Sequence, residues 1–121
     1  MAYDEYLADR IRNQFRDLKH HFEEKKMMGG LCFMVDDKMC CGILIDKNTN
    51  DSLLMARVGL YFYEEALSKK GALTMDFTGR PMKGYVFVGS EGIDSEPELQ
   101  FWIQKCLDFN PLVKTSIRKK K

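Results

Sequence analysis

The sequence predicts a two-layer α+β domain, in which helices cover one face of an antiparallel sheet of about five strands. Three observations predict this class. Apolar residues recur at helical spacing near both ends of the chain, from Tyr3 to Leu18 and from Leu99 to Leu107. Short strand-like runs fill much of the region between them. Several of these runs are joined by connections too short for a parallel crossover, so we expect antiparallel pairing.

The two terminal helices follow from their apolar stripes. The first is expected at residues 3–19, where Leu7, Ile11 and Phe15 lie on one side. The second follows Ser95 and Glu98, which form a capping box, and it is expected to end near residue 109. Trp102 lies on its apolar stripe, and we expect it to be buried against the sheet.

A third, shorter helix is expected at residues 60–71, and Gly59 and Gly71 mark its two ends. The strands are expected at 31–36, 37–46, 52–58, 73–77 and 82–89. The predicted order is therefore helix, three strands, helix, two strands, helix, or α-β(3)-α-β(2)-α. Residues 1–112 form one domain, and residues 113–121 form a basic tail that we expect to be disordered.

Turn chemistry sets the expected connections. Asp36 and Asp37 suit a tight turn between the first two strands. Gly42, inside a strand, indicates a bulge or a close backbone approach. The remaining residues with a predicted structural role are Gly29 and Gly30, which interrupt regular structure before the first strand, and Asp76, Gly79, Pro81 and Gly84, which shape the last hairpin.

Composition excludes several classes of protein. The apolar runs are far shorter than the roughly 20 residues that cross a bilayer, and the polar N-terminus is no signal peptide, so we expect an intracellular protein that does not associate with membranes. Five of the 19 basic residues lie in the tail, at Lys114, Arg118, Lys119, Lys120 and Lys121. The tail is either a solvated end or a weak phosphate-binding arm for nucleic acid.

The four cysteines are expected to be reduced and buried. No C-x-x-C spacing occurs, so neither a metal nor another cofactor is expected. Cys40 and Cys41 are adjacent, and on a regular strand their side chains would point to opposite faces of the sheet.

One set of basic residues offers a ligand site. Arg57, Arg80 and Lys83, joined by Lys25 and Lys26, could bind a phosphate or a carboxylate. The alternative is structural, because Asp76 could pair with Arg80 or with Arg57 across the hairpin.

Five blocks of sequence resemble the N-terminal domain of the TfoX/Sxy family of bacterial competence regulators. They are "KKMMGG" (25–30), "FMVDDKM" (33–39), "ARVG" (56–59), "YEEAL" (63–67) and "MDFTGRPMKGYVFV" (75–88), in the order in which the family has them. The resemblance implies the α-β(3)-α-β(2)-α fold, a cytoplasmic bacterial protein and no enzymatic activity. Met28 and Asp37 depart from the family pattern, which usually has Phe at the first position and often has Gly at the second. The family's full-length regulators carry a second, helical domain, so this chain resembles a stand-alone form.

The leading functional hypothesis is a non-enzymatic regulatory or interaction domain that binds another protein or itself. Its basis is the presence of strands that are apolar on both faces and of aromatic residues off the helical stripes. No catalytic constellation is visible in the sequence. The alternative hypothesis is an anion-binding or enzymatic domain that uses Arg57, Arg80 and Lys83.

Overall fold

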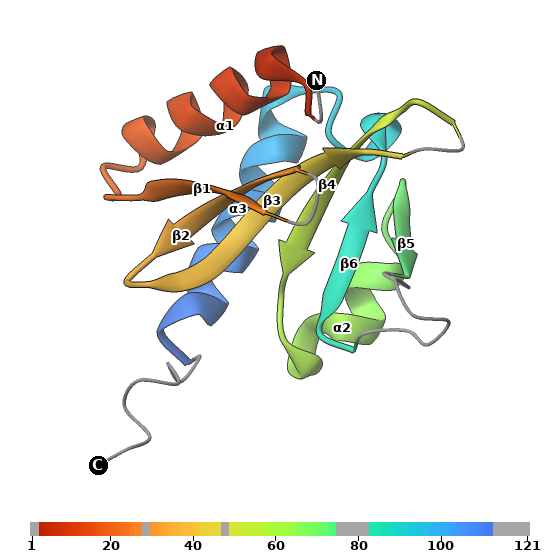
Figure 1. Cartoon of the computed structure of the whole chain (residues 1–121). Helices are drawn as coiled ribbons and strands as arrows, with labels where there is room; N and C mark the ends of the chain where they lie inside the picture. The colour runs from red at the N-terminus through yellow and green to blue at the C-terminus, as the bar shows by residue number, and fades with distance from the viewer. Residues whose placement is uncertain (1–2, 28–29, 47–48, 75–82, 113–121) are drawn as a thin grey trace.

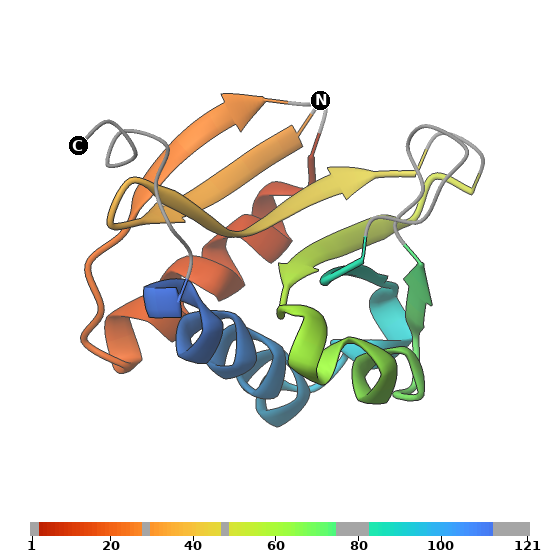
Figure 2. The same cartoon turned by 90° about the horizontal axis from the view of Figure 1, so that it is seen from below.

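The chain forms two layers, a six-stranded sheet and a layer of three helices (Figure 1). The computed structural model describes residues 3–27, 30–46, 49–74 and 83–112. Seen from below, all three helices lie on the same side of the sheet (Figure 2). The predicted two-layer α+β class is therefore confirmed.

Each strand pairs antiparallel with its neighbours, in the spatial order β1-β2-β3-β4-β6-β5. The strands are β1 (Glu23–Met27), β2 (Gly30–Val35), β3 (Lys38–Ile45), β4 (Ser52–Arg57), β5 (Ala72–Thr74) and β6 (Tyr85–Val88). The helices are α1 (Glu5–Asp17), α2 (Leu60–Leu67) and α3 (Glu96–Phe109), with 3-10 turns η1 (Ser90–Gly92) and η2 (Asn110–Leu112). None of the helices in the described ranges is long and apolar enough to span a bilayer.

Strand β1 is the element that the sequence prediction omitted, so the first group of strands has four members instead of three. Its sequence, "EEKKM", begins with four charged residues, and all four are exposed. The strand lies at the edge of the sheet, where charged side chains remain in water and discourage pairing with other chains. An edge strand of this kind has no apolar alternation by which it could be recognised.

Caps define the helix ends. Asp4 Oδ1 accepts a hydrogen bond from the Tyr6 backbone N–H at 2.9 Å, so α1 begins at Glu5 instead of residue 3. The prediction for α2 was also too long, because the helix ends at Leu67 and Ser68 Oγ donates to the Glu65 carbonyl at 2.6 Å. The capping box of Ser95 and Glu98 at the start of α3 is confirmed.

The β2–β3 hairpin turns through Asp36 and Asp37, as predicted. Both residues have positive φ angles, 56° and 63°, and Val35 pairs with Lys38 across the turn. Positive φ at both central positions matches the type I′ turn, whose twist suits two neighbouring antiparallel strands.

The core lies between the helices and the side of the sheet that faces them, which we call the helix face. Phe15 of α1, Ile103 of α3 and Phe33 of β2 are completely buried there. Trp102 is 2% exposed in the same cluster, as its place on the apolar stripe of α3 predicted. A buried amide also joins the layers, because Asn110 Nδ2 donates to the Val35 carbonyl at 3.3 Å.

A β-bulge brings Cys40 and Cys41 to the same face, which corrects the expectation that they point to opposite faces. Phe33 pairs with Cys41 while Met34 pairs with Met39, so Cys40 is the extra residue on β3. Both thiols belong to the core cluster on the helix face, together with Cys106 of α3. The bulge lies just before Gly42 on β3, and the Gly42 backbone is closely approached by the Met55 side chain.

Two glycines are required where β4 leads into α2. Gly59 has φ 86° and ψ 164°, a conformation that only glycine adopts easily, and the Phe109 ring lies 2.5 Å from where a Cβ would stand. Gly84 has φ 93°, and its carbonyl accepts hydrogen bonds from the N–H groups of Val58 and Gly59 at 2.9 and 3.0 Å. This contact fixes the start of β6 beside the end of β4.

Candidate functional site

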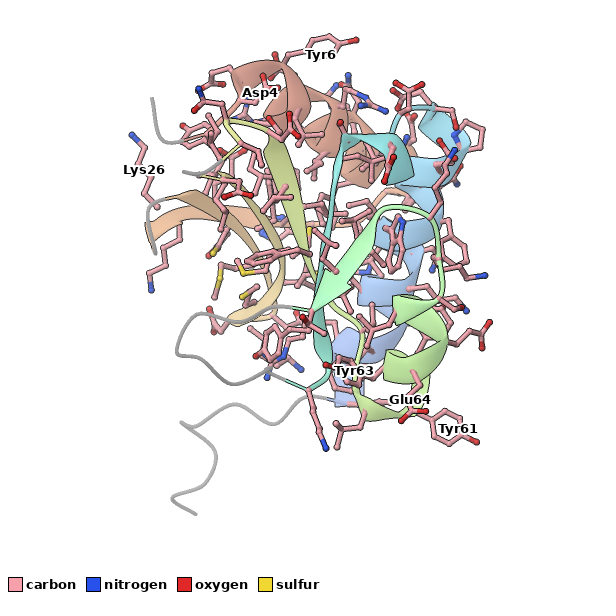
Figure 3. The ribbon with its side chains drawn as sticks, turned by 90° about the vertical axis from the view of Figure 1, so that its right-hand side faces the viewer. Asp4, Tyr6, Lys26, Tyr61, Tyr63 and Glu64 are labelled. Atoms are coloured by element: carbon pink, nitrogen blue, oxygen red, sulfur yellow. The ribbon has the colours of Figure 1, made fainter. Side chains whose placement is uncertain are left out.

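The side of the sheet away from the helices, which we call the open face, carries a second apolar cluster. Its members are Cys32, Met34, Met39, Met55, Tyr85 and Phe87, from β2, β3, β4 and β6. Side chains along a strand alternate between the two faces, so each of these strands contributes to both clusters. Sulfur atoms gather on the strands away from α3 (Figure 3), and no described helix covers this side (Figure 2).

One cross-strand row forms the middle of the open face. Cys32 pairs with Gly42, Gly42 with Met55, and Met55 with Phe87. The Met55 methyl carbon would lie 2.9 Å from a Cβ at Gly42, so the Met55 side chain fills the space that glycine leaves. Cys32 and Met55 are each 1% exposed, whereas Met34, Met39, Tyr85 and Phe87 are half-buried. The row therefore has a tight centre and an accessible margin.

Arg57 and Tyr85 define one end of the open face. The two residues pair directly across β4 and β6, and the Arg57 guanidinium carbon lies 5.2 Å from the centre of the Tyr85 ring. This distance is typical of a cation–π contact. Lys83 precedes Gly84 and is exposed at the same end of the sheet. At the far edge, Leu73 pairs with Phe87 and is 53% exposed, which extends the apolar row onto β5.

Four of the five residues predicted to bind an anion lie within the described ranges, and these four are not all at one place. Arg57 and Lys83 lie at the same end of the sheet, but Lys25 and Lys26 lie on β1. Strands β2 and β3 separate β1 from β4, which corresponds to about 14 Å at the usual strand spacing. Other predicted residues lie outside the described ranges: Gly29, Asp76, Gly79, Arg80, Pro81 and the tail residues Lys114, Arg118, Lys119, Lys120 and Lys121.

The four cysteines are free thiols and are buried, as predicted. The thiols of Cys106 and Cys41 hydrogen-bond to Cys40 and favour its ionised form, which lowers the pKa of Cys40. The hydrogen bond to Cys40, and then burial, raise the pKa of Cys41 and of Cys106. Among the described residues, no group of three or more potential metal ligands has a suitable arrangement.

Two pockets lie away from the open face, and sequence reasoning identified neither. One has a volume of about 350 Å³ and is lined by Arg16, Lys19, His20, His21 and Phe22, at the end of α1. The other, also about 350 Å³, is lined by Lys69, Lys70, Gly92, Pro97, Glu98, Phe101 and Trp102. The capping box and the "KK" that follows α2 are visible in the sequence, but their proximity depends on how the segment after α2 lies against the start of α3.

The family comparison agrees with this architecture. The model of the TfoX N-terminal domain matches residues 13–110, which include every described strand, all of α2 and α3 and the end of α1. No curated protein matches the chain. The match covers well over half of the 121 residues, and the chain therefore belongs to the TfoX N-terminal domain family.

Proposed function

We propose that this domain is a non-enzymatic interaction module of a bacterial cytoplasm, and that it binds a protein partner through the open face of its sheet. The observation that carries the proposal is the accessible margin of that face, where Met34, Met39, Tyr85 and Phe87 are half-buried and no described helix covers them. Flexible thioethers and aromatic rings are typical of adaptable protein-binding surfaces.

The charge of this face sets the chemistry of the partner. Arg57 stacks on Tyr85 at one end of the face, whereas the β1 edge carries both Lys25, paired with Cys32, and Glu23, paired with Met34. The predicted partner segment is therefore amphipathic, with an apolar strip for the methionines and an acidic group for Arg57. An amphipathic helix of this kind would form a third layer, equivalent to the helices that cover the other side of the sheet.

A matched pair of variants tests the proposal. Tyr85→Ser removes an aromatic ring from the open face, and Tyr61→Ser removes a fully exposed ring that projects from α2 (Figure 3). Proteins captured from the native host would be quantified with wild-type and variant baits. We expect Tyr85→Ser to lose a partner that wild type and Tyr61→Ser both retain.

A photocrosslinking residue at position 34 then locates the contact. It should crosslink to the same partner, and the equivalent residue at position 61 should not. Equal capture by both variants, or crosslinking at position 61 alone, would contradict binding through the open face. Light scattering of the purified protein distinguishes a second copy of the chain from a different partner, because self-association needs no lysate.

A further inference from the structure

The pocket beside the start of α3 has the composition of a ligand site. It is formed where the residues after α2, the 3-10 turn η1 and the first two turns of α3 meet. Its volume of about 350 Å³ is within the usual range for small-molecule sites. It belongs to the helix layer, so it is separate from the open face of the sheet.

The floor of the pocket is apolar and held rigidly. Trp102 is 2% exposed and belongs to the main core cluster. The Phe101 ring packs edge-on against it, with ring centres 5.4 Å apart and an interplanar angle of 79°. Pro97 completes the apolar lining. Because the core fixes the indole, this floor is formed before any ligand arrives.

Ammonium groups surround this floor. Lys69 Nζ lies 5.2 Å from the centre of the Phe101 ring, and Lys105 Nζ lies 5.6 Å from it. Lys70 Nζ lies 3.4 Å from Glu98 Oε2. Lys69 and Lys70 line the pocket together, and Glu98 is the one carboxylate among its lining residues.

The start of α3 is already capped and offers little to a ligand. Ser95 Oγ accepts the N–H of Glu98 at 3.3 Å, and Pro97 has no N–H to donate. Glu98 Oε1 accepts hydrogen bonds from the Ser95 N–H and Oγ at 3.0 and 3.1 Å. An anion in this pocket would therefore depend on the lysines, and it would compete with Glu98 for Lys70 and with the more distant Glu65 for Lys69.

We propose that this pocket binds a small organic anion, with an aromatic or branched aliphatic group on the Phe101–Trp102 floor and a carboxylate or phosphate against Lys69 and Lys70. Burial of the ligand's apolar group favours binding, and the two ammonium groups select a ligand with a negative charge. This site does not depend on the protein-binding role of the open face.

Trp102 is the only tryptophan in the chain, so its fluorescence reports directly on the pocket. The probes are phenylacetate and phenyl phosphate, with phenylethanol as the neutral analogue and inorganic phosphate as the anion without a ring. We expect a saturable fluorescence change with both aromatic anions, and binding at least about tenfold weaker with each of the two control compounds. No saturation with either aromatic anion overturns the site, and equal affinity for phenylethanol overturns the choice of an anion.

Three variants give the sign of the charge effect. Lys69→Gln and Lys70→Gln should each weaken phenylacetate binding by about threefold to fivefold, as expected for a partly exposed charge pair. Glu98→Gln should strengthen it by a similar factor, because glutamine preserves the capping box while Lys70 loses its competitor. Lys26→Gln makes the same charge change on β1 and should leave binding unchanged. Weaker binding by Glu98→Gln, with native circular dichroism, overturns the proposal.

Discussion

Arg12 on α1 and Glu24 on β1 form a two-pronged ion pair. Arg12 Nε lies 2.6 Å from Glu24 Oε2, and Arg12 Nη2 lies 2.9 Å from Glu24 Oε1. Arg12 Nη1 also donates to Asp9 Oδ1 at 2.6 Å within the helix. The hydrogen bond to Glu24 is the largest cause of the raised pKa of Arg12. The pair joins the charged edge strand to the helix layer, although the four leading residues of β1 are all exposed.

Replacement of Arg12 should loosen β1 more than the rest of the sheet. Arg12→Met removes both hydrogen bonds to Glu24, and we expect the free energy of unfolding to fall by about 1 kcal/mol. Hydrogen exchange measured by mass spectrometry should rise over residues 23–27 and change little over β4. Arg16→Met is the matched control, because among the described residues the Arg16 side chain donates to Asn13 of the same helix and not to β1. Equal exchange in β1 for the two variants would contradict this role of Arg12.

The pair of Arg10 and Glu96 predicts how stability responds to acid. Arg10 Nε lies 2.7 Å from Glu96 Oε2, and the hydrogen bond from Arg10 is the main reason that the pKa of Glu96 is lowered from 4.5. A carboxylate with a lowered pKa stabilises the folded state above its unfolded pKa, and this contribution is lost as the pH falls through the folded value. Glu96 is 57% exposed, so solvent keeps the effect below about 1 kcal/mol.

Urea unfolding at a series of pH values between 7 and 3 gives the free energy of unfolding at each pH and so measures this contribution. The loss of stability below pH 4.5 should be smaller in Glu96→Gln than in wild type. The same substitution at Glu64, which projects from α2 (Figure 3), should leave the acid slope as it is. A steeper slope in Glu96→Gln would refute the assignment.

Gly59 should tolerate no side chain. In Gly59→Ala the backbone would keep a φ near 86° that alanine adopts with strain, and the new methyl group would press on the Phe109 ring. We expect a loss of about 2 kcal/mol or more in the free energy of unfolding. Gly89→Ala is the control, since φ is −76° there and the nearest atom to the new Cβ is the Gly71 carbonyl at 3.8 Å. A similar loss at both positions would show that backbone conformation is not the cause.

The thiols should react only when the protein unfolds. Cys32, Cys40, Cys41 and Cys106 are each at most 1% exposed, and a thiol-specific reagent needs an accessible thiolate. We expect the native protein to label no faster than it unfolds, and all four thiols to label in denaturant. Rapid labelling of Cys40 in native buffer would mean that the bulge opens locally, and peptide mapping would identify it.

The sequence predicted the elements whose signals are local. The capping box of Ser95 and Glu98, the apolar stripe that includes Trp102, and the turn at Asp36 and Asp37 each involve residues a few positions apart, and all three are present. Strand β1 was missed because an exposed edge strand needs no apolar pattern.

The cysteine cluster and the pocket beside the start of α3 could not be predicted in the same way. The side of the sheet on which Cys40 lies depends on a one-residue shift in the pairing of β2 with β3, and "MCC" contains no sign of it. Lys70 and Glu98 are far apart in the chain, and their 3.4 Å contact exists only because the segment after α2 lies beside the start of α3. Two strands separate Arg57 from Lys25, which the sequence does not indicate, and anion binding by Arg57, Arg80 and Lys83 stays a prediction.

The strand order has a consequence for how the chain is assembled during synthesis. Strands β1, β2 and β3 each pair with the next strand along the chain, so this part of the sheet can form as the chain leaves the ribosome. Strand β5 is synthesised before β6, yet it pairs with β6 and not with β4. The place beside β4 is taken by β6. Until Tyr85–Val88 emerges, the edge of β4 is therefore unprotected, and a nascent chain that pauses there exposes it to mispairing.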